Sequence, residues 1–294
     1  MAVPTEASWL EAHPYLRRLA EVCARVRRAL DGIGVGMPVL EPPDFESHRS
    51  GFLAGVPLLQ GEPPLLSLDP AGRSTVSLVA RLAGDSEDSG TLAAGARALD
   101  EQLRGEPDAP RRVAEWLLGE DSLRPASAGL LRFLGWTAAA RHLAPATAAF
   151  GLWRGAATGT GGELDERWLH RYCPLCGSPP AMAQLVGADA GRKRLLVCGA
   201  CGSRWGYKRT KCPFCEADAE RLSSMTAEGE SGLRIDSCES CRGYVKTYDG
   251  QGNEALLLAD WTSLHLDLLA QDRGLKRMAA SLYELDSAPA AVPG

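Results

Sequence analysis

The chain has 294 residues, of which 45% are hydrophobic, and a formal net charge of −5 at pH 7. This length allows two globular domains, and the acidic balance argues against the basic surface that a nucleic-acid-binding protein usually presents. The first ten residues hold no basic start followed by an apolar core, so we expect no secretory signal, and no stretch near the end is long and apolar enough for membrane insertion.

The first 165 residues are predicted to form an all-helical domain, with apolar residues recurring at helical spacing from Trp9 to Leu30. Pro14 is suited to begin the main helix of this stretch and Gly32 to end it. Cys23 lies on the apolar stripe, so we expect a buried core thiol rather than a nucleophile. Further helices, whose apolar faces are typical of a bundle core, are predicted at residues 74–82, 92–103, 110–118, 128–140 and 144–153.

Two further features of this region carry little functional signal. The acidic residues between Asp85 and Asp108 are typical of a solvated helix face, although such a face could also receive a basic peptide. Residues 155–162 are rich in glycine but lack the Gly-Lys-Ser/Thr ending of a phosphate-binding loop, which indicates a linker.

Four Cys-x-x-Cys pairs lie between residues 173 and 241 of a chain with nine cysteines in all. Two thiolates separated by two residues can hold one soft metal ion from a single turn, and two such pairs complete a tetrahedral site. The gaps of 21 and 22 residues inside the region favour pairing in chain order, with room for a β-hairpin within each gap. The sequence therefore predicts two metal sites, with Cys173, Cys176, Cys198 and Cys201 as ligands of the first and Cys212, Cys215, Cys238 and Cys241 as ligands of the second.

The two four-cysteine units form an internal repeat with an offset of about 40 residues. In the first unit, strands are predicted at residues 181–186 and 194–197 around a turn at 187–191. In the second unit, they are predicted at residues 222–226 and 233–236 around a turn at 229–232.

After Asp249 the chain is predicted to return to helix. The predicted architecture is therefore α+β: a helical domain at residues 1–165, two zinc-ribbon-like β-hairpin metal modules at 166–211 and 212–249, and C-terminal helices at 250–294. One face of these last helices is expected to hold Leu257, Trp261, Leu264 and Leu268, and the next Leu275, Met278 and Leu282.

The residue that follows each cysteine pair distinguishes the two units. Gly177 and Gly202 follow the pairs of the first unit, and glycine can adopt the left-handed conformation that directs backbone N–H groups at thiolate sulfur. Glu216 and Arg242 stand at the corresponding places of the second unit. The second site is therefore predicted to be looser or more solvated than the first.

Other roles for eight paired cysteines are less consistent with the sequence. Disulfides need an oxidising compartment, and a thioredoxin-type redox pair is expected once, beside a βαβ unit, rather than four times on hairpins. The identity of the metal stays open at this point, because four thiolates suit zinc and iron equally well in geometry.

Seven cations and no acid lie between Gly191 and Lys211, whereas the second unit is mainly acidic. These cations could contact phosphates beside Trp205 and Tyr207 as stacking faces, so a zinc-ribbon nucleic-acid-binding protein with structural zinc is an alternative interpretation. In the simpler interpretation they offset the thiolate charge and attract the acidic second unit. The cations are Arg192, Lys193, Arg194, Arg204, Lys208, Arg209 and Lys211.

Catalytic motifs are not evident: the sequence has no His-Glu-x-x-His, no Gly-x-Ser-x-Gly and no dinucleotide fingerprint. His170 is the only histidine near the cysteines in sequence, and we expect a hydrogen-bonding neighbour rather than a ligand, because each site already has four sulfurs. Closed tetrathiolate sites lack the open position that a hydrolytic metal needs. The sequence thus favours a binding or assembly protein over an enzyme.

Three segments carry motifs of a known family: His170 to Pro180, the block from Arg194 to Trp205, and Asp236 to Lys246. They resemble the formate dehydrogenase accessory protein family, FdhE. The similarity is highly specific from His170 to Lys246 and weaker over Asp260 to Arg273. Over residues 1–165 it rests mainly on length and helical character.

The resemblance implies a cytoplasmic assembly factor for respiratory formate dehydrogenase, made of a helical domain followed by two rubredoxin-like modules that bind two iron ions. Its implied partner is the catalytic subunit of the exported enzyme, held before the twin-arginine pathway moves it across the membrane. The eight paired cysteines would then be iron ligands, and no catalytic residue is carried over. The resemblance leaves open the partner-binding face, recognition of the signal peptide or the mature body, and the oligomeric state.

Overall fold

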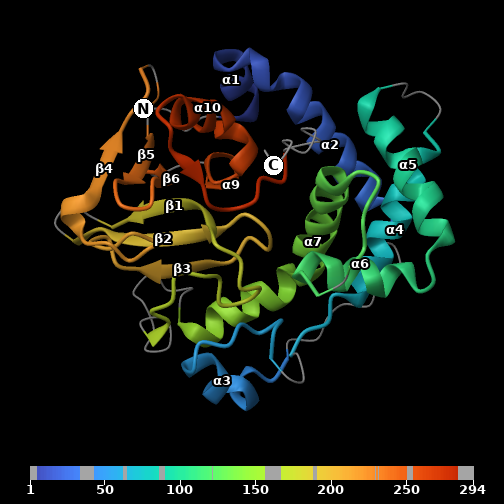
Figure 1. The fold of residues 1–294 in the computed structure, drawn as a ribbon, viewed down its shortest axis with the longest axis horizontal. Coiled ribbons are helices and arrows are strands. Elements are labelled where there is room, and N and C mark those ends of the chain that lie inside the picture. The colour runs from blue at the N-terminus through green and yellow to red at the C-terminus, as the bar shows by residue number, and fades with distance from the viewer. Residues whose placement is uncertain are drawn as a thin grey trace, which may run out of the picture. The chain divides into compact units, whose positions relative to one another are not determined.

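The computed structural model describes residues 5–33, 43–61, 65–85, 90–120, 122–155, 167–187, 191–228, 230, 232–249 and 254–283. The chain forms two compact units, whose elements are drawn in Figure 1. The mixed unit combines residues 1–17, 43–65 and 147–280, and the helical unit combines residues 18–42, 66–146 and 281–294. Each unit contains segments that are far apart in the sequence. The four-segment division made from the sequence stays a prediction.

The helical unit is built around α4, which packs against both α5 and α6. Gly72 permits the contact with α6, since a Cβ atom there would lie 2.0 Å from the carbonyl oxygen of Pro110. Leu78, Leu99 and Val113 are fully buried between these helices. Cys23 is 6% exposed, which confirms the predicted buried thiol. The helices are α2 (Arg17–Asp31), α4 (Asp69–Ala83), α5 (Thr91–Gly105), α6 (Ala109–Leu118) and the first part of α7 (Ala128–Arg154).

Helix α7 corrects one prediction, because the two helices expected at residues 128–140 and 144–153 are continuous. Pro145 lies inside this helix. A proline removes only one backbone hydrogen bond, and the buried side chains of Leu143, Ala146 and Phe150 hold the helix on both sides of it. Among the described residues, no helix is long and apolar enough to cross a bilayer.

The mixed unit contains one seven-stranded sheet that both four-cysteine units share (Figure 1). Each four-cysteine repeat contributes three antiparallel strands. Strand β1 of the first repeat pairs in parallel with β6 of the second repeat, where Met182 lies opposite Lys246. The strand order is β3-β2-β1-β6-β5-β4, and β7 pairs in parallel with β6. The strands are β1 (Pro180–Val186), β2 (Lys193–Cys198), β3 (Arg204–Tyr207), β4 (Leu222–Met225), β5 (Leu233–Cys238), β6 (Gly243–Tyr248) and β7 (Lys276–Arg277).

The four strands predicted from the sequence correspond to β1, β2, β4 and β5, whereas β3, β6 and β7 were not predicted. Both predicted hairpin turns include positions outside the described residues. Most of the predicted linker at 155–162 also lies outside them. The internal repeat is confirmed, because each four-cysteine repeat follows the same order: a cysteine pair, two strands, a second cysteine pair and a third strand. The repeats lie side by side in the sheet and are not separate hairpins.

The C-terminal region is only partly helical, with α9 (Glu254–Leu257), the 3-10 helix η6 (Asp260–Ser263) and α10 (Leu264–Asp272). The second helical face predicted here is wrong: Gly274 has a φ of +66°, and the chain then continues as strand β7. Leu268, predicted to share an apolar face with Leu257 and Trp261, is 63% exposed, whereas those two residues are buried. The chain forms three short helices instead of one continuous helix, so residues at helical spacing do not all lie on one face.

Short helices from the N-terminal half complete the mixed unit. Thr5 caps α1 with a capping box, and the indole N–H of Trp9 donates to the carbonyl of Thr262 at 3.1 Å. This buried hydrogen bond fastens α1 to η6. The elements are α1 (Glu6–Ala12), η1 (Pro14–Leu16), η2 (Phe45–His48) and α3 (Arg49–Leu53), together with η5 (Ala219–Arg221) before β4.

Candidate metal centres

The eight paired cysteines form two groups of four thiols, and within each group the sulfur atoms all lie within 4.8 Å of one another. The grouping is the one predicted from pairing in chain order. The first group holds Cys173, Cys176, Cys198 and Cys201, and the second holds Cys212, Cys215, Cys238 and Cys241.

The distances between sulfur atoms test whether a metal ion fits. A tetrahedral site with metal–sulfur bonds of about 2.3 Å has sulfur atoms roughly 3.8 Å apart. In the second group the Cys212–Cys241 and Cys215–Cys238 distances are 3.8 and 3.7 Å. In the first group the corresponding distances, Cys173–Cys201 and Cys176–Cys198, are 3.5 and 3.4 Å. Both groups therefore fit one zinc or iron ion, the first a little more tightly.

The same distances exclude disulfides in this structure. A disulfide bond joins its sulfur atoms at about 2.04 Å. All nine cysteines belong to the described residues, and none of them forms a disulfide.

Each cysteine pair lies in a turn of the same backbone geometry. The residue after the pair has a positive φ: 78° at Gly177, 76° at Gly202, 64° at Glu216 and 61° at Arg242. Its N–H donates to the carbonyl of the first cysteine of the pair at 2.9 to 3.1 Å in all four turns. The left-handed conformation expected for glycine therefore also occurs where the second repeat has glutamate or arginine.

Backbone N–H groups and burial act in opposite directions on the thiols. The N–H groups of Leu175, Phe214 and Gly243 donate to sulfur at 3.3 to 3.4 Å. Burial raises the pKa of the Cys173 thiol well above its usual range, and burial likewise raises the pKa of Cys212 to about 12. Four thiols so close together cannot all ionise without a cation among them, and a metal ion supplies that charge.

Solvent exposure differs between the two groups. All four cysteines of the first group are buried, whereas Cys215 is exposed and Cys241 is half-buried in the second. The prediction of a more solvated second site is therefore confirmed.

A segment from the N-terminal half covers one turn of the first group, and we call residues 55–60 the cover segment. The N–H groups of Leu58 and Leu59 donate to the carbonyls of Pro174 and Leu175 at 3.1 and 2.9 Å. The side chain of Gln60 donates to the carbonyl of Cys176 at 3.1 Å. The first turn of the first group is thus shielded by a segment more than 100 residues earlier in the chain.

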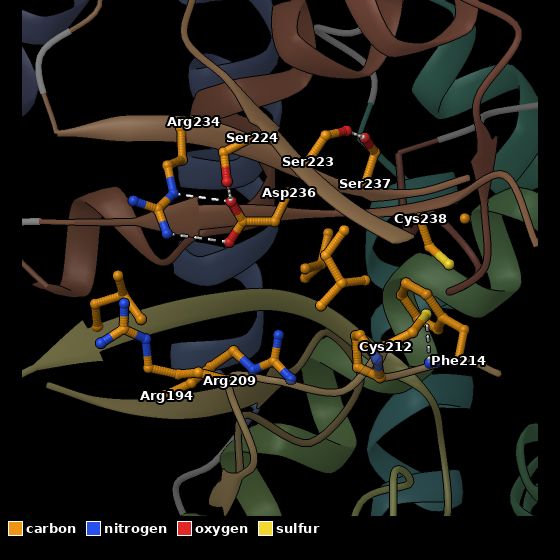
Figure 2. Close-up of a pocket in the computed structure, with 15 residues that line it drawn as sticks. Arg194, Arg209, Cys212, Phe214, Ser223, Ser224, Arg234, Asp236, Ser237 and Cys238 are labelled. Carbon is orange, nitrogen blue, oxygen red and sulfur yellow. Dashed lines mark hydrogen bonds and ion pairs between the residues drawn. The ribbon is translucent and has the colours of Figure 1, made fainter. Parts of the chain in front are cut away.

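A cavity of about 200 Å³ lies between the two repeats, beside the second group. Figure 2 shows Cys212 and Cys238 at one side of it and Arg194 and Arg234 at the other. In the wall of the cavity, Asp236 accepts hydrogen bonds from Ser224 at 2.6 Å and from Arg234 at 2.8 Å. Two of the four cysteines of the second group therefore line this cavity.

The cations of the basic run mostly contact acidic residues or backbone carbonyls. Lys211 pairs with Asp218 at 2.8 Å, and Arg192 pairs with Asp249. Both acids belong to the second repeat, so the cations do attract the acidic second unit. Trp205 is fully buried and offers no stacking face to a nucleic acid. These contacts favour the simpler interpretation of the basic run.

His170 lies apart from the thiols and acts as a structural neighbour. Its backbone carbonyl accepts a hydrogen bond from the indole of Trp205 at 3.2 Å, and its ring stacks on Tyr172.

A third group of side chains that could hold a metal was missed from the sequence: His13, Glu230 and His265. These residues lie far apart in the chain and form no motif, so only the fold brings them together.

Residues 172–209 match a family model described as FdhE, central domain. The chain is similar to a protein FdhE homolog of Pseudomonas aeruginosa, with 34% identity over 285 residues that cover 91% of this chain and 84% of the relative. A protein FdhE homolog of Stutzerimonas stutzeri is 32% identical over 302 residues, covering 94% and 86%. The crystal structure of the FdhE protein from Pseudomonas aeruginosa is similar with a TM-score of 0.57 and 25% identity, covering 96% of both chains.

Proposed function

Because this chain belongs to the FdhE family, we propose that it is an accessory protein in the maturation of respiratory formate dehydrogenase. It binds the catalytic subunit of that enzyme in the cytoplasm, before twin-arginine export, and is not itself an enzyme. It carries two iron ions in its four-cysteine groups. The proposed iron ligands are Cys173, Cys176, Cys198 and Cys201 in the first group and Cys212, Cys215, Cys238 and Cys241 in the second.

The observation that carries this proposal is the pair of preformed four-cysteine groups in one shared sheet. The match to the FdhE central domain at residues 172–209 contains the whole first group. Four sulfur ligands complete a tetrahedral coordination shell, which favours a binding role over hydrolytic catalysis. Two closed sites in one sheet are suited to supporting a docking surface.

Metal ligation also offers a way to control that surface. When bound, iron in four thiolates supplies a one-electron redox couple and a visible colour. Small hairpin repeats have little apolar core of their own, so ligation is expected to supply much of their folding free energy. Loss of the ions would disorder the repeats and remove the docking surface, so binding would follow iron supply.

The identity of the metal is tested by the absorbance spectrum of freshly purified protein together with metal analysis. We expect a red protein with about two iron atoms per chain, one for each four-cysteine group. Colourless zinc protein that binds nucleic acid with a steep salt dependence would instead support the zinc-ribbon alternative.

The role of the first group is tested with the variant Cys173→Ser/Cys176→Ser. We expect it to lose one ion and its affinity for the catalytic subunit, measured with purified proteins. The matched control is Cys23→Ser, which removes a buried thiol outside both groups.

A double variant that stays well folded and still binds the subunit would assign recognition to another surface. The acidic helical face is the competing candidate, although Asp85, Asp100 and Asp108 there each form an ion pair with an arginine at 2.5 to 2.7 Å.

A further inference from the structure

Outside the four-cysteine groups, the described residues bring together one more set of side chains that can ligate a metal. Nε2 of His13 lies 2.8 Å from Oε1 of Glu230, and Nε2 of His265 lies 2.6 Å from the same oxygen. The side chains of His13, Glu230 and His265 are 12%, 7% and 15% exposed. The cluster thus consists of two imidazoles around one carboxylate, largely shielded from water.

The surroundings of His13 determine which ring nitrogen faces this cluster. Nδ1 lies 2.9 Å from the backbone carbonyl oxygen of Trp9. A carbonyl oxygen only accepts hydrogen bonds, so Nδ1 carries the proton and donates it. In the neutral ring, Nε2 then directs a lone pair at Glu230. Metal-bound histidines have this tautomer when a backbone carbonyl holds their other nitrogen.

A lone pair that faces a carboxylate oxygen at 2.8 Å is repelled unless positive charge lies between them. A proton on Nε2 of His13 supplies that charge for one contact, but the same carboxylate oxygen also has Nε2 of His265 at 2.6 Å. Nδ1 of His265 has no hydrogen-bond partner among the described residues, and its Nε2 has only the short contact with Glu230. A shared metal ion would satisfy both nitrogens and the carboxylate together.

The three residues come from separate parts of the mixed unit. His13 follows α1, Glu230 lies between β4 and β5 of the second repeat, and His265 lies in the first turn of α10. The ring of Trp9 stacks on His13 with centroids 4.1 Å apart, which holds the imidazole in place. Tyr15, 59% exposed, lies edge-on to both imidazoles and forms the solvent-facing side of the cluster.

We propose that His13, Glu230 and His265 form a third metal site, which takes a divalent first-row transition ion such as Zn²⁺. Two imidazole nitrogens and one carboxylate oxygen are harder ligands than the sulfur of the four-cysteine groups, so the chain offers two chemically different kinds of site. Three protein ligands leave a fourth position for water. The bound ion fastens α1 and α10 to the hairpin of the second repeat. This site does not depend on the function proposed above.

The test is the total metal content, zinc plus iron, of full-length protein equilibrated with micromolar free Zn²⁺. The unaltered chain is expected to hold about three ions, one for each cluster, and Glu230→Gln and His265→Gln about two. His48→Gln is the matched control, since it removes an imidazole outside the three clusters and should keep all three ions. The two ions retained by the four-cysteine groups show that each variant is folded.

Anomalous X-ray scattering at the zinc edge then locates the ions. A peak between the two imidazoles and Glu230 supports the site. The proposal is overturned if the unaltered, folded protein binds only two ions, or if Glu230→Gln and His265→Gln both keep the third.

Discussion

Glu216 and Arg242 hold a left-handed backbone conformation that costs most residues free energy. Their φ values of 64° and 61° match the turn geometry that glycine provides in the first repeat. For a residue with a Cβ atom this conformation costs roughly 1–2 kcal/mol. The turn itself is preserved, because both N–H groups still bond to the first cysteine of the pair. The second repeat therefore retains a local strain that the first repeat avoids.

Replacing Glu216 by glycine should relieve that strain. Glu216 is exposed, and we expect Glu216→Gly to raise the free energy of unfolding of metal-loaded protein by roughly 1 kcal/mol. Chemical denaturation measures the change. Gly177→Ala is the matched control and should lower the free energy of unfolding. Gly177 has a φ of 78°, and a Cβ atom there would lie 2.5 Å from the side-chain nitrogen of Gln60. An unchanged or lower stability for Glu216→Gly would contradict the strain argument.

At the scale of elements, the cover segment makes the two four-cysteine groups differ in access. We predict that a thiol-alkylating reagent with a competing chelator modifies Cys215 first, and the buried cysteines of the first group last. Mass spectrometry of digested samples over time measures the order. Gln60→Ala removes the hydrogen bond to Cys176 and should speed modification of that residue alone. Equal rates in the two groups would show that the cover segment does not protect.

A buried charge network joins β6 and β7 to the C-terminal helices. Nζ of Lys246, fully buried, lies 2.7 Å from both Asp260 and Asp267. Arg277 contacts the same two carboxylates at 2.7 and 2.8 Å. Burial alone raises the pKa of Asp260, but the two cations lower it below its usual range. The network therefore balances two cations against two carboxylates.

Removing one cation from this network should be costly. We expect Lys246→Met to lower the free energy of unfolding by roughly 3 kcal/mol, because two buried carboxylates would then share the single cation Arg277. The exposed Lys276 on β7 provides a matched control, and Lys276→Met should change stability by less than about 0.5 kcal/mol. Both values come from chemical denaturation of metal-loaded protein. Similar stabilities for the two variants would argue against the network.

For the whole molecule, the parallel pairing of β1 with β6 makes the two repeats one structural body. Stripping metal with a chelator should therefore remove hydrogen-exchange protection from β1 to β6 together, while α4 to α6 of the helical unit keep theirs. Hydrogen exchange followed by mass spectrometry measures both regions at once. Loss of protection in one repeat alone would show that the sheet does not couple them.

The cysteine groups could be predicted from the sequence because each pair is local and its spacing implies the chemistry. Strand β6 was harder to predict, because Lys246 and Thr247 are fully buried and hide its apolar pattern. Both are buried with acidic partners: Lys246 contacts the carboxylates of distant Asp260 and Asp267, and the hydroxyl of Thr247 donates to Asp236. The cluster of His13, Glu230 and His265 likewise depends on contacts between distant segments. The sequence alone does not show which polar side chains from distant segments come into contact in the fold.

The cover segment has a practical consequence for dissecting this protein. A fragment beginning at residue 166 would keep every paired cysteine but lose Leu58 and Leu59, each 2% exposed in the intact chain. Their removal would bare an apolar surface and free the carbonyls of Pro174 and Leu175, which invites aggregation. The solubility of such a fragment would then reflect the missing cover segment rather than the state of its four-cysteine groups. Supplying residues 43–65 as a separate peptide should rescue its solubility.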